Sequence, residues 1–241
     1  YQVRRDPDLV LYYPFLKTDA FQNTLSNYAV SEEGTLSGTF GGTFGISNFT
    51  DPSWTSGRWP EKAALQFDRA HRNCVSVAPS PKLDLTGQIT LAAWVRCPDS
   101  NKGGHLFSCR TEEGINYQFG CFSKEDPYYA GKLQFLRTDD AFSPVVYSAG
   151  QYRWTSEWTF LAVTHDRQTV RFYINGTLFE SVPFVSATQP VSARLFIGDV
   201  PAAGGKTFGY AAFHGLIDEM AIFKRALSDG EIHEMYEAGK P

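Results

Sequence analysis

Two adjacent acids, Asp218 and Glu219, lie inside the apolar run GLIDEMAIF at residues 215–223 and are the first candidates for chemistry. Glycoside hydrolysis needs two carboxyl groups, roughly 5–5.5 Å apart for retention or roughly 6.5–9.5 Å apart for inversion. On a regular strand successive side chains point to opposite faces, so acids that act on one sugar stand two residues apart. We therefore predict that Asp218 shares one face with Met220, that Glu219 shares the other with Ala221, and that the acids are not a catalytic pair.

Other catalytic patterns are equally weak. The pairs Glu112–Glu113 and Asp139–Asp140 fall at the ends of expected strands, and the chain has no Gly-x-Ser-x-Gly elbow for a serine nucleophile. None of the cysteines Cys74, Cys97, Cys109 and Cys121 forms a CxxC pair, which argues against structural zinc. One disulfide among them is possible, and the spacing does not select the pair. The sequence thus indicates a protein that is not an enzyme.

Charge and composition exclude further classes. The 241 residues carry a net charge of −4, and no run of Lys and Arg exceeds two residues, so a nucleic-acid footprint is absent. No apolar run approaches the roughly 18–20 residues of a membrane-spanning helix. The chain begins at Tyr1 inside a charged segment, and we expect it to be part of a longer protein.

The elements that must position any site are strands. Short apolar segments recur at a spacing of about 8–12 residues with turn residues between them, which is typical of a β-sandwich. The expected strands are 8–15, 63–67, 73–78, 87–97, 104–110, 115–122, 131–138, 144–148, 157–166, 169–176, 178–184, 192–199 and 215–223. Asn175–Gly176 predicts a tight hairpin turn, because both residues tolerate positive φ.

Two segments depart from the strand pattern. Residues 16–62 are rich in Gly, Ser, Thr and Asn and are expected to be a long irregular excursion with short strands at most. Residues 228–238 predict a short C-terminal helix, since Ser228 and Glu231 have the spacing of a capping box. We expect one domain over residues 1–241: an all-β, two-sheet antiparallel sandwich closed by this helix.

Several stretches resemble the LamG-like, concanavalin A-type jelly roll. They are LVLYYPF, AALQFD, VSVAPSPKLDLTGQITLAAWVR, WTFLAVTHDRQTVRFYINGTL, RLFIGD and FHGLIDEMAIFKRALSDGEIHEMYEAG, in the family's order over nearly the whole chain. RDPDLVLYYPF and SGRWPEKAALQFD are also similar to LamG modules that follow FecR-like regions in bacterial surface proteins. The resemblance implies two stacked sheets, one concave, in a periplasmic, cell-surface or extracellular protein that recognises glycans or other surface proteins.

The resemblance also raises the question of calcium. Related modules often use a late acid in the position of Asp218, with an early partner from the region of residues 19–27. Here that region lacks the usual Asp-x-Ser-Gly pattern, so no cofactor is required and a structural calcium at Asp218 is an open alternative. The other explanation for Asp218 is that it binds backbone N–H groups at a strand end.

Sugar binding is the leading function, with stacking on loop aromatics and hydrogen bonds from the concave face. The predicted ligand-binding residues are Trp54, Arg110, Gln118, Tyr128, Tyr129, Gln134 and Trp154. Trp59, Trp94 and Trp158 are expected to be structural, and Arg58 in GRWP to make ordinary surface ion pairs. The first alternative is a structural or protein-interaction module that binds no sugar, and a glycoside hydrolase or lyase is the third.

Overall fold

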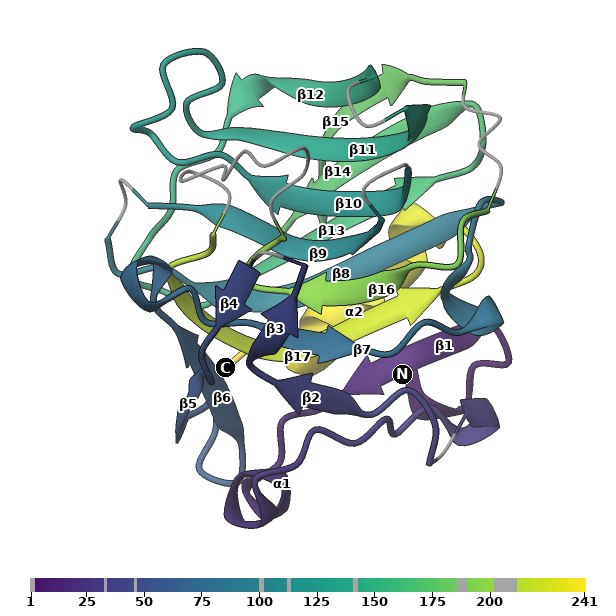
Figure 1. Ribbon diagram of the computed structural model, residues 1–241. Helices are drawn as coiled ribbons and strands as arrows, with labels where there is room; N and C mark the ends of the chain where they lie inside the picture. The colour runs from purple at the N-terminus through teal and green to yellow at the C-terminus, as the bar shows by residue number, and fades with distance from the viewer. Residues whose placement is uncertain are drawn as a thin grey trace.

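Two antiparallel sheets lie face to face in the computed structural model (Figure 1). The structure describes residues 3–32, 34–45, 47–99, 102–111, 114–140, 143–185, 190–201 and 212–241. Over these residues the eight-stranded sheet runs β15 (Thr177–Pro183), β14 (Thr169–Ile174), β13 (Thr159–His165), β8 (Ile89–Arg96), β17 (Gly215–Phe223), β6 (Ala63–Phe67) and β5 (Ser53–Ser56), with β1 (Leu9–Tyr13) also paired to β17. The seven-stranded sheet runs β12 (Ser143–Gln151), β11 (Lys132–Asp140), β10 (Ile115–Cys121), β9 (Gly104–Arg110), β16 (Arg194–Ile197), β7 (Val75–Val77) and β2 (Gly38–Phe40).

Alternation along the strands builds the core between the sheets. In β8, Leu91, Ala93 and Val95 point into the main apolar core, while Ala92 and Trp94 point to the opposite, outer face. A hairpin of β3 (Gly42–Phe44) and β4 (Ser47–Phe49) packs two phenylalanines on the outer face of the seven-stranded sheet. The predicted all-β sandwich of two antiparallel sheets is confirmed.

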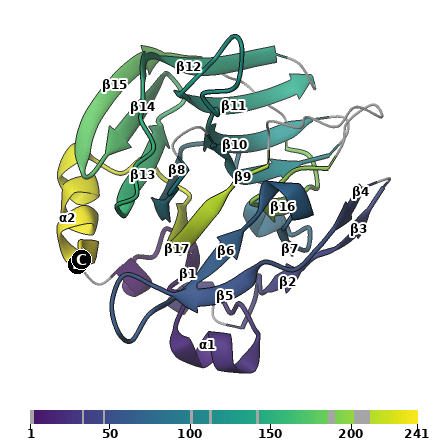
Figure 2. The same ribbon diagram turned by 90° about the vertical axis from the view of Figure 1, so that its left-hand side faces the viewer.

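The C-terminal helix α2 (Asp229–Gly239) covers the outer face of the eight-stranded sheet (Figure 2). The Glu231 backbone N–H donates to the Ser228 hydroxyl, and the Ser228 N–H donates to the Glu231 carboxylate, which is the predicted capping box. Ile232 and Met235 are buried against the sheet, and Tyr236 stacks on Trp94 with ring centroids 5.6 Å apart.

Residues 16–62 are more ordered than the sequence suggests. They contain a helix that was not expected, α1 (Lys17–Gln22), and the strands β2 and β5 that extend both main sheets. The helix escaped prediction because its N-cap is Leu16, which has no side-chain cap hydrogen bond, while the Asp19 carboxylate accepts from the Leu16 N–H instead. Short 3₁₀ helices cover Val3–Arg5, Val30–Glu32, Arg69–His71 and Pro81–Leu83.

Turns and thiols complete the framework. Asn175 and Gly176 join β14 to β15 with φ of 50° and 72°, as a type I′ hairpin turn requires. The four cysteines are all buried and free, so no disulfide supports the sandwich. None of the described helices is long and apolar enough to cross a membrane.

Candidate functional site

Asp218 and Glu219 lie on the same side of the eight-stranded sheet, and the prediction that they face opposite sides is wrong. A β-bulge between Asp218 and Met220 makes Glu219 an extra residue in β17, with a positive φ of 64°. The bulge shifts the alternation by one position. Asp218 therefore pairs with Trp94 on the outer face, and Met220 joins the core.

The two acids share two cations, and we call Arg58, Lys62, Asp218 and Glu219 the ion cluster. The Arg58 Nε donates to Asp218 Oδ2 at 3.0 Å, and the same guanidinium pairs with Glu219 and donates to the Gly239 carbonyl. Lys62 Nζ lies 3.2 Å from Asp218 Oδ1 and 3.3 Å from Glu219 Oε2. The expectation of a surface ion pair for Arg58 is thus wrong, because its side chain is fully buried between Trp59 and Trp94.

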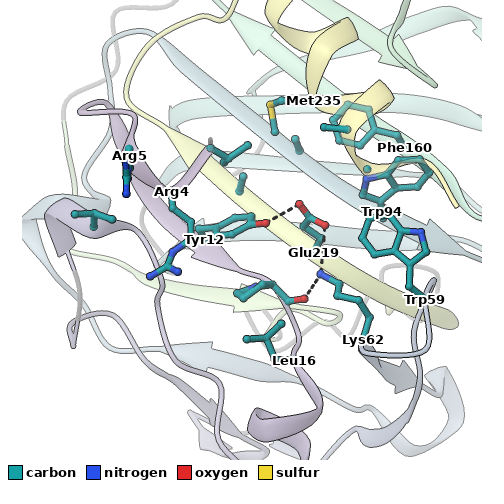
Figure 3. Close-up of a pocket in the computed structure, with 17 residues that line it drawn as sticks. Arg4, Arg5, Tyr12, Leu16, Trp59, Lys62, Trp94, Phe160, Glu219 and Met235 are labelled. Atoms are coloured by element: carbon teal, nitrogen blue, oxygen red, sulfur yellow. Dashed lines mark hydrogen bonds and ion pairs between the residues drawn. The ribbon is translucent and has the colours of Figure 1, made fainter. Parts of the chain in front are cut away.

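The two acids of the ion cluster have opposite pKa shifts. Burial raises the pKa of Asp218. Burial also opposes ionisation of Glu219, but the charges of Lys62 and Arg58 outweigh it and lower the pKa of Glu219. The Tyr12 hydroxyl donates to Glu219 Oε1 at 2.7 Å, which occupies a further carboxylate oxygen (Figure 3). Both carboxylates are thus held by fixed donors from Arg58, Lys62 and Tyr12.

The same contacts do not fit a calcium ion at Asp218. Calcium takes six to eight oxygen ligands, whereas Asp218 is surrounded by two cationic side chains. Asn27, from the expected partner region, binds the β1 backbone, where its Oδ1 accepts from the Tyr12 N–H at 2.8 Å. Within the described ranges, no group of three or more His, Cys, Asp and Glu residues could hold a metal ion.

A pocket of about 610 Å³ opens beside the ion cluster, between α2 and the N-terminal segment (Figure 3). Short side chains form the floor of the pocket, because Ala92 and Ala221 are cross-strand partners in β8 and β17. Aromatic and thioether side chains form its walls, namely Tyr12, Trp59, Trp94, Phe160 and Met235. The charges at its base, Lys62 and Glu219, pair with each other, whereas the exposed Arg4 and Arg5 add positive charge at its N-terminal side.

The outer face of the seven-stranded sheet carries a polar row across four strands. His105, Gly120, Gln134 and Tyr147 are successive cross-strand partners on β9, β10, β11 and β12. Glycine is required at position 120 because the backbone of β9 approaches closely, and a Cβ there would lie 2.5 Å from the Gly104 carbonyl oxygen. Gln134 Nε2 reaches across to 2.7 Å from His105 Nδ1. Burial and the charge of Arg110 lower the pKa of His105 to about 3, so this imidazole is neutral near pH 7.

Next to this row lies an aromatic cluster of Phe122, Tyr128, Tyr129 and Tyr147. The rings of Tyr129 and Tyr147 stack with centroids 4.1 Å apart and an interplanar angle of 14°. Phe122 lies 5.3 Å from Tyr129 and 5.8 Å from Tyr147, and Tyr128 is 82% exposed. Asp126 fixes the turn, because its Oδ1 accepts from the N–H groups of Tyr128 and Tyr129. The cluster therefore presents aromatic surface to solvent at a fixed place.

The predicted polar contacts share one face but are not exposed. Arg110, Gln118 and Gln134 all lie on the outer face of the seven-stranded sheet, with exposed fractions of 8%, 3% and 3%. The Gln118 carbonyl oxygen accepts from the Ser108 hydroxyl, and its Nε2 lies 3.4 Å from His105 Nε2. The two glutamines hold one another through His105, so they support the surface beside the aromatic cluster rather than form it.

Two predicted tryptophans lie away from this face. Trp154 is 3% exposed and packs in the core against Tyr152 and Phe213, which does not agree with a ligand-stacking role. Trp54 lies on β5 of the other sheet, where it contacts Phe15 and Phe40. Of the predicted aromatics, Tyr128 and Tyr129 are therefore the two that the structure brings together.

Sequence reasoning missed Phe122, Tyr147 and His105 as neighbours of these tyrosines. The sequence places Tyr147 only in an expected strand, and its position beside Tyr129 depends on the register of β11 with β12. Glu112 and Glu113 lie outside the described residues, as do the side chains of Asp139 and Asp140. The buried thiols are poor nucleophiles, since burial raises the pKa of Cys97 and of Cys109 to about 12.

Comparisons with known proteins agree on one fold. A family model described as the Concanavalin A-like lectin/glucanases superfamily matches residues 71–233. Human usherin is 27% identical over 169 residues, which cover 69% of this chain and only 3% of usherin.

Solved structures give the same result. Domain 4 of AbnA, a GH43 extracellular arabinanase from Geobacillus stearothermophilus solved with arabinotriose, has a TM-score of 0.67 and 19% identity over 95% of this chain and 98% of that domain. The binding domain of botulinum neurotoxin DC, solved with rat synaptotagmin II, has a TM-score of 0.66 and 13% identity over 98% of this chain and 52% of its own. At these identities the likenesses show the fold, and this chain spans about half of the toxin chain.

Proposed function

The chain belongs to the Concanavalin A-like lectin/glucanases superfamily, and from this premise we propose that it is a noncatalytic recognition module whose ligand is a carbohydrate. We place the module in an exported or cell-surface bacterial protein longer than this chain. Laminin G-like domains usually occur in extracellular proteins, which supports that setting.

The observation that carries the proposal is the aromatic cluster of Phe122, Tyr128, Tyr129 and Tyr147. Sugar rings have apolar C–H faces that pack on aromatic rings, and tyrosine adds a hydroxyl for the polar rim. The rings of Tyr129 and Tyr147 are already stacked without a ligand, so a saccharide that packs on them need not order them first. Tyr128, 82% exposed beside this pair, extends the surface that a saccharide could cover.

Two structural relatives add support by analogy. Domain 4 of the arabinanase was solved in complex with arabinotriose, and one botulinum neurotoxin type C structure concerns its interaction with two ganglioside molecules. Arabinotriose is a saccharide and a ganglioside carries one, and the two proteins share this fold over 98% and 52% of their chains, although fold alone does not determine function.

A glycan array and affinity gel electrophoresis test the proposal. Wild-type protein should be retarded by at least one polysaccharide, and Tyr128→Ala and Tyr129→Ala should each weaken that binding about 2- to 12-fold, the loss of one aromatic contact of about 0.5–1.5 kcal/mol. Phe21→Ala is the matched control, because Phe21 is 92% exposed on α1. The proposal fails if no glycan binds, or if Phe21→Ala weakens binding as much as the tyrosine variants do.

A separate assay tests the proposal that the module is noncatalytic. Incubation with the bound polysaccharide should release no reducing ends above the rate without protein, because the paired acids of the ion cluster have no free carboxylate to offer. Sustained release that is abolished by a carboxylate substitution would overturn this part and favour the hydrolase or lyase alternative.

A further inference from the structure

A second pocket, of about 410 Å³, lies on the outer face of the seven-stranded sheet and contains two arginines, Arg110 and Arg194. The two residues are direct cross-strand partners in β9 and β16, and both point away from the core. Phe44 and Phe196 form an apolar wall with ring centroids 5.2 Å apart, and Thr111 and Ser192 add hydroxyl groups. The volume falls within the roughly 300–1,000 Å³ of small-molecule sites.

Like charges directly opposite one another in a sheet are unfavourable, so this pair needs an explanation. The Arg194 guanidinium lies over the Phe44 ring, 4.8 Å from its centroid, so one face of this guanidinium makes a cation–π contact. Arg110 is only 8% exposed. Over the part of the chain that the structure describes, neither side chain has a hydrogen bond or an ion pair with an acid.

Other buried cations of the protein have fixed acidic or carbonyl partners. Arg58 and Lys62 bind the acids of the ion cluster. Arg137 is fully buried and donates to the backbone carbonyls of residues 85, 86, 87 and 116. Each of these cations recovers its lost hydration from several fixed acceptors, as a buried charge must. Arg110 stands apart because it is also buried and has no such acceptor among the described residues.

We propose that this pocket binds the carboxylate or sulfate group of an acidic saccharide. The anion would lie between the two guanidiniums, whose planar forks suit the paired oxygens of such groups. The sugar ring would pack on the half-buried Phe44, which the buried Phe196 supports from beneath. The saccharide part of this inference rests on the proposed function, whereas the anion part rests on the arginines alone.

Matched polymer pairs test the inference by calorimetry at low salt. Polygalacturonate is compared with its methyl ester, and dextran sulfate with dextran, so that each pair differs only in the anionic group. Wild-type protein should bind at least one acidic polymer about tenfold more tightly than its neutral partner, as expected for charge-assisted hydrogen bonds. The pair that shows the preference identifies carboxylate or sulfate as the source.

Three substitutions locate the effect. Arg110→Gln and Arg194→Gln should each remove the tenfold preference, and neither should lower the melting temperature, since each relieves the opposed charges. Arg153→Gln, at an exposed arginine outside the pocket, should change neither quantity. Arg194 is the more exposed of the pair, so its variant keeps the test valid if Arg110→Gln does not fold.

The outcomes separate this inference from the proposed function. Binding of neutral glycans with no preference for acidic ones overturns the inference and leaves the proposed function intact. A melting temperature raised by inorganic sulfate in wild type but not in Arg110→Gln, with no polysaccharide bound, overturns the saccharide assignment and supports the anion site. A preference for acidic polymers that survives in both arginine variants overturns the anion site.

Discussion

Arg58 holds both acids of β17 and the end of α2, so its replacement by glutamine should remove a large part of the folding stability. The variant loses the ion pairs with Asp218 and Glu219 and the hydrogen bond to the Gly239 carbonyl. Breaking a buried ion pair costs about 3–5 kcal/mol, because the remaining charge is left in a medium that solvates it poorly. Lys62 stays within 3.2 Å of Asp218 and 3.3 Å of Glu219, which places the expected loss near the lower end.

A loss of about 3 kcal/mol corresponds to a fall of roughly 6–12 °C in melting temperature for a domain of this size. Urea denaturation followed by tryptophan fluorescence measures the free energy directly, since Trp59 and Trp94 flank the guanidinium. The control is Lys102→Gln, whose partner Glu125 is 42% exposed, and it should change stability by less than about 1 kcal/mol.

The double variant Arg58→Gln/Asp218→Asn sharpens the test. Removing the charge of Asp218 should recover part of the loss, with a coupling energy of about 0.5–3 kcal/mol between the two positions. A loss below about 1 kcal/mol in Arg58→Gln, or strictly additive effects in the double variant, would refute the conclusion that the ion cluster is a structural unit.

Other perturbations have equally definite outcomes. Stability should fall as the pH drops from about 6.5 towards 4, because burial lowers the pKa of His165 to about 4 and the unfolded chain, at the ordinary value of 6.5, takes up its proton first. His165→Gln should reduce this pH dependence of the urea midpoint, with the remainder due to His105, whose pKa burial lowers to about 3, and an unchanged slope would contradict the assignment. Ser228→Ala should destabilise the protein by about 1 kcal/mol in thermal melts through loss of the α2 cap, whereas no shift would show that the capping box contributes nothing. EDTA should leave the melting temperature unchanged, and a rise with added calcium would revive the metal hypothesis, since a ligand of the folded state alone raises apparent stability.

The strands and the C-terminal helix could be predicted because their signals are local. Apolar alternation, the Asn175–Gly176 turn and the Ser228–Glu231 spacing each depend on a few neighbouring residues. The ion cluster depends instead on contacts between residues about 160 positions apart, and on one bulged residue that reversed the expected face of Glu219. The bulge has no sequence signal of its own, since the non-glycine residue Glu219 adopts a positive φ there.

The candidate site was predicted only in part for a similar reason. Tyr128 and Tyr129 were identified because loop aromatics are common in sugar sites, but Tyr147 reaches them only through the pairing of β11 with β12. Gln118 and Gln134 were placed correctly on one face, yet their exposure was not predictable, because it depends on what packs over each strand.

Arg58 and Arg110 show why burial alone does not assign a role to a charged residue. Both residues are buried, so each guanidinium loses hydration on folding. Arg58 recovers that loss from acids fixed in β17. Arg110 lies opposite Arg194 of β16 and has no fixed acceptor among the described residues. A bound anion would supply this compensation for Arg110. It follows that substitutions at Arg58 should reduce stability and leave ligand affinity unchanged, while substitutions at Arg110 should reduce affinity and leave stability unchanged.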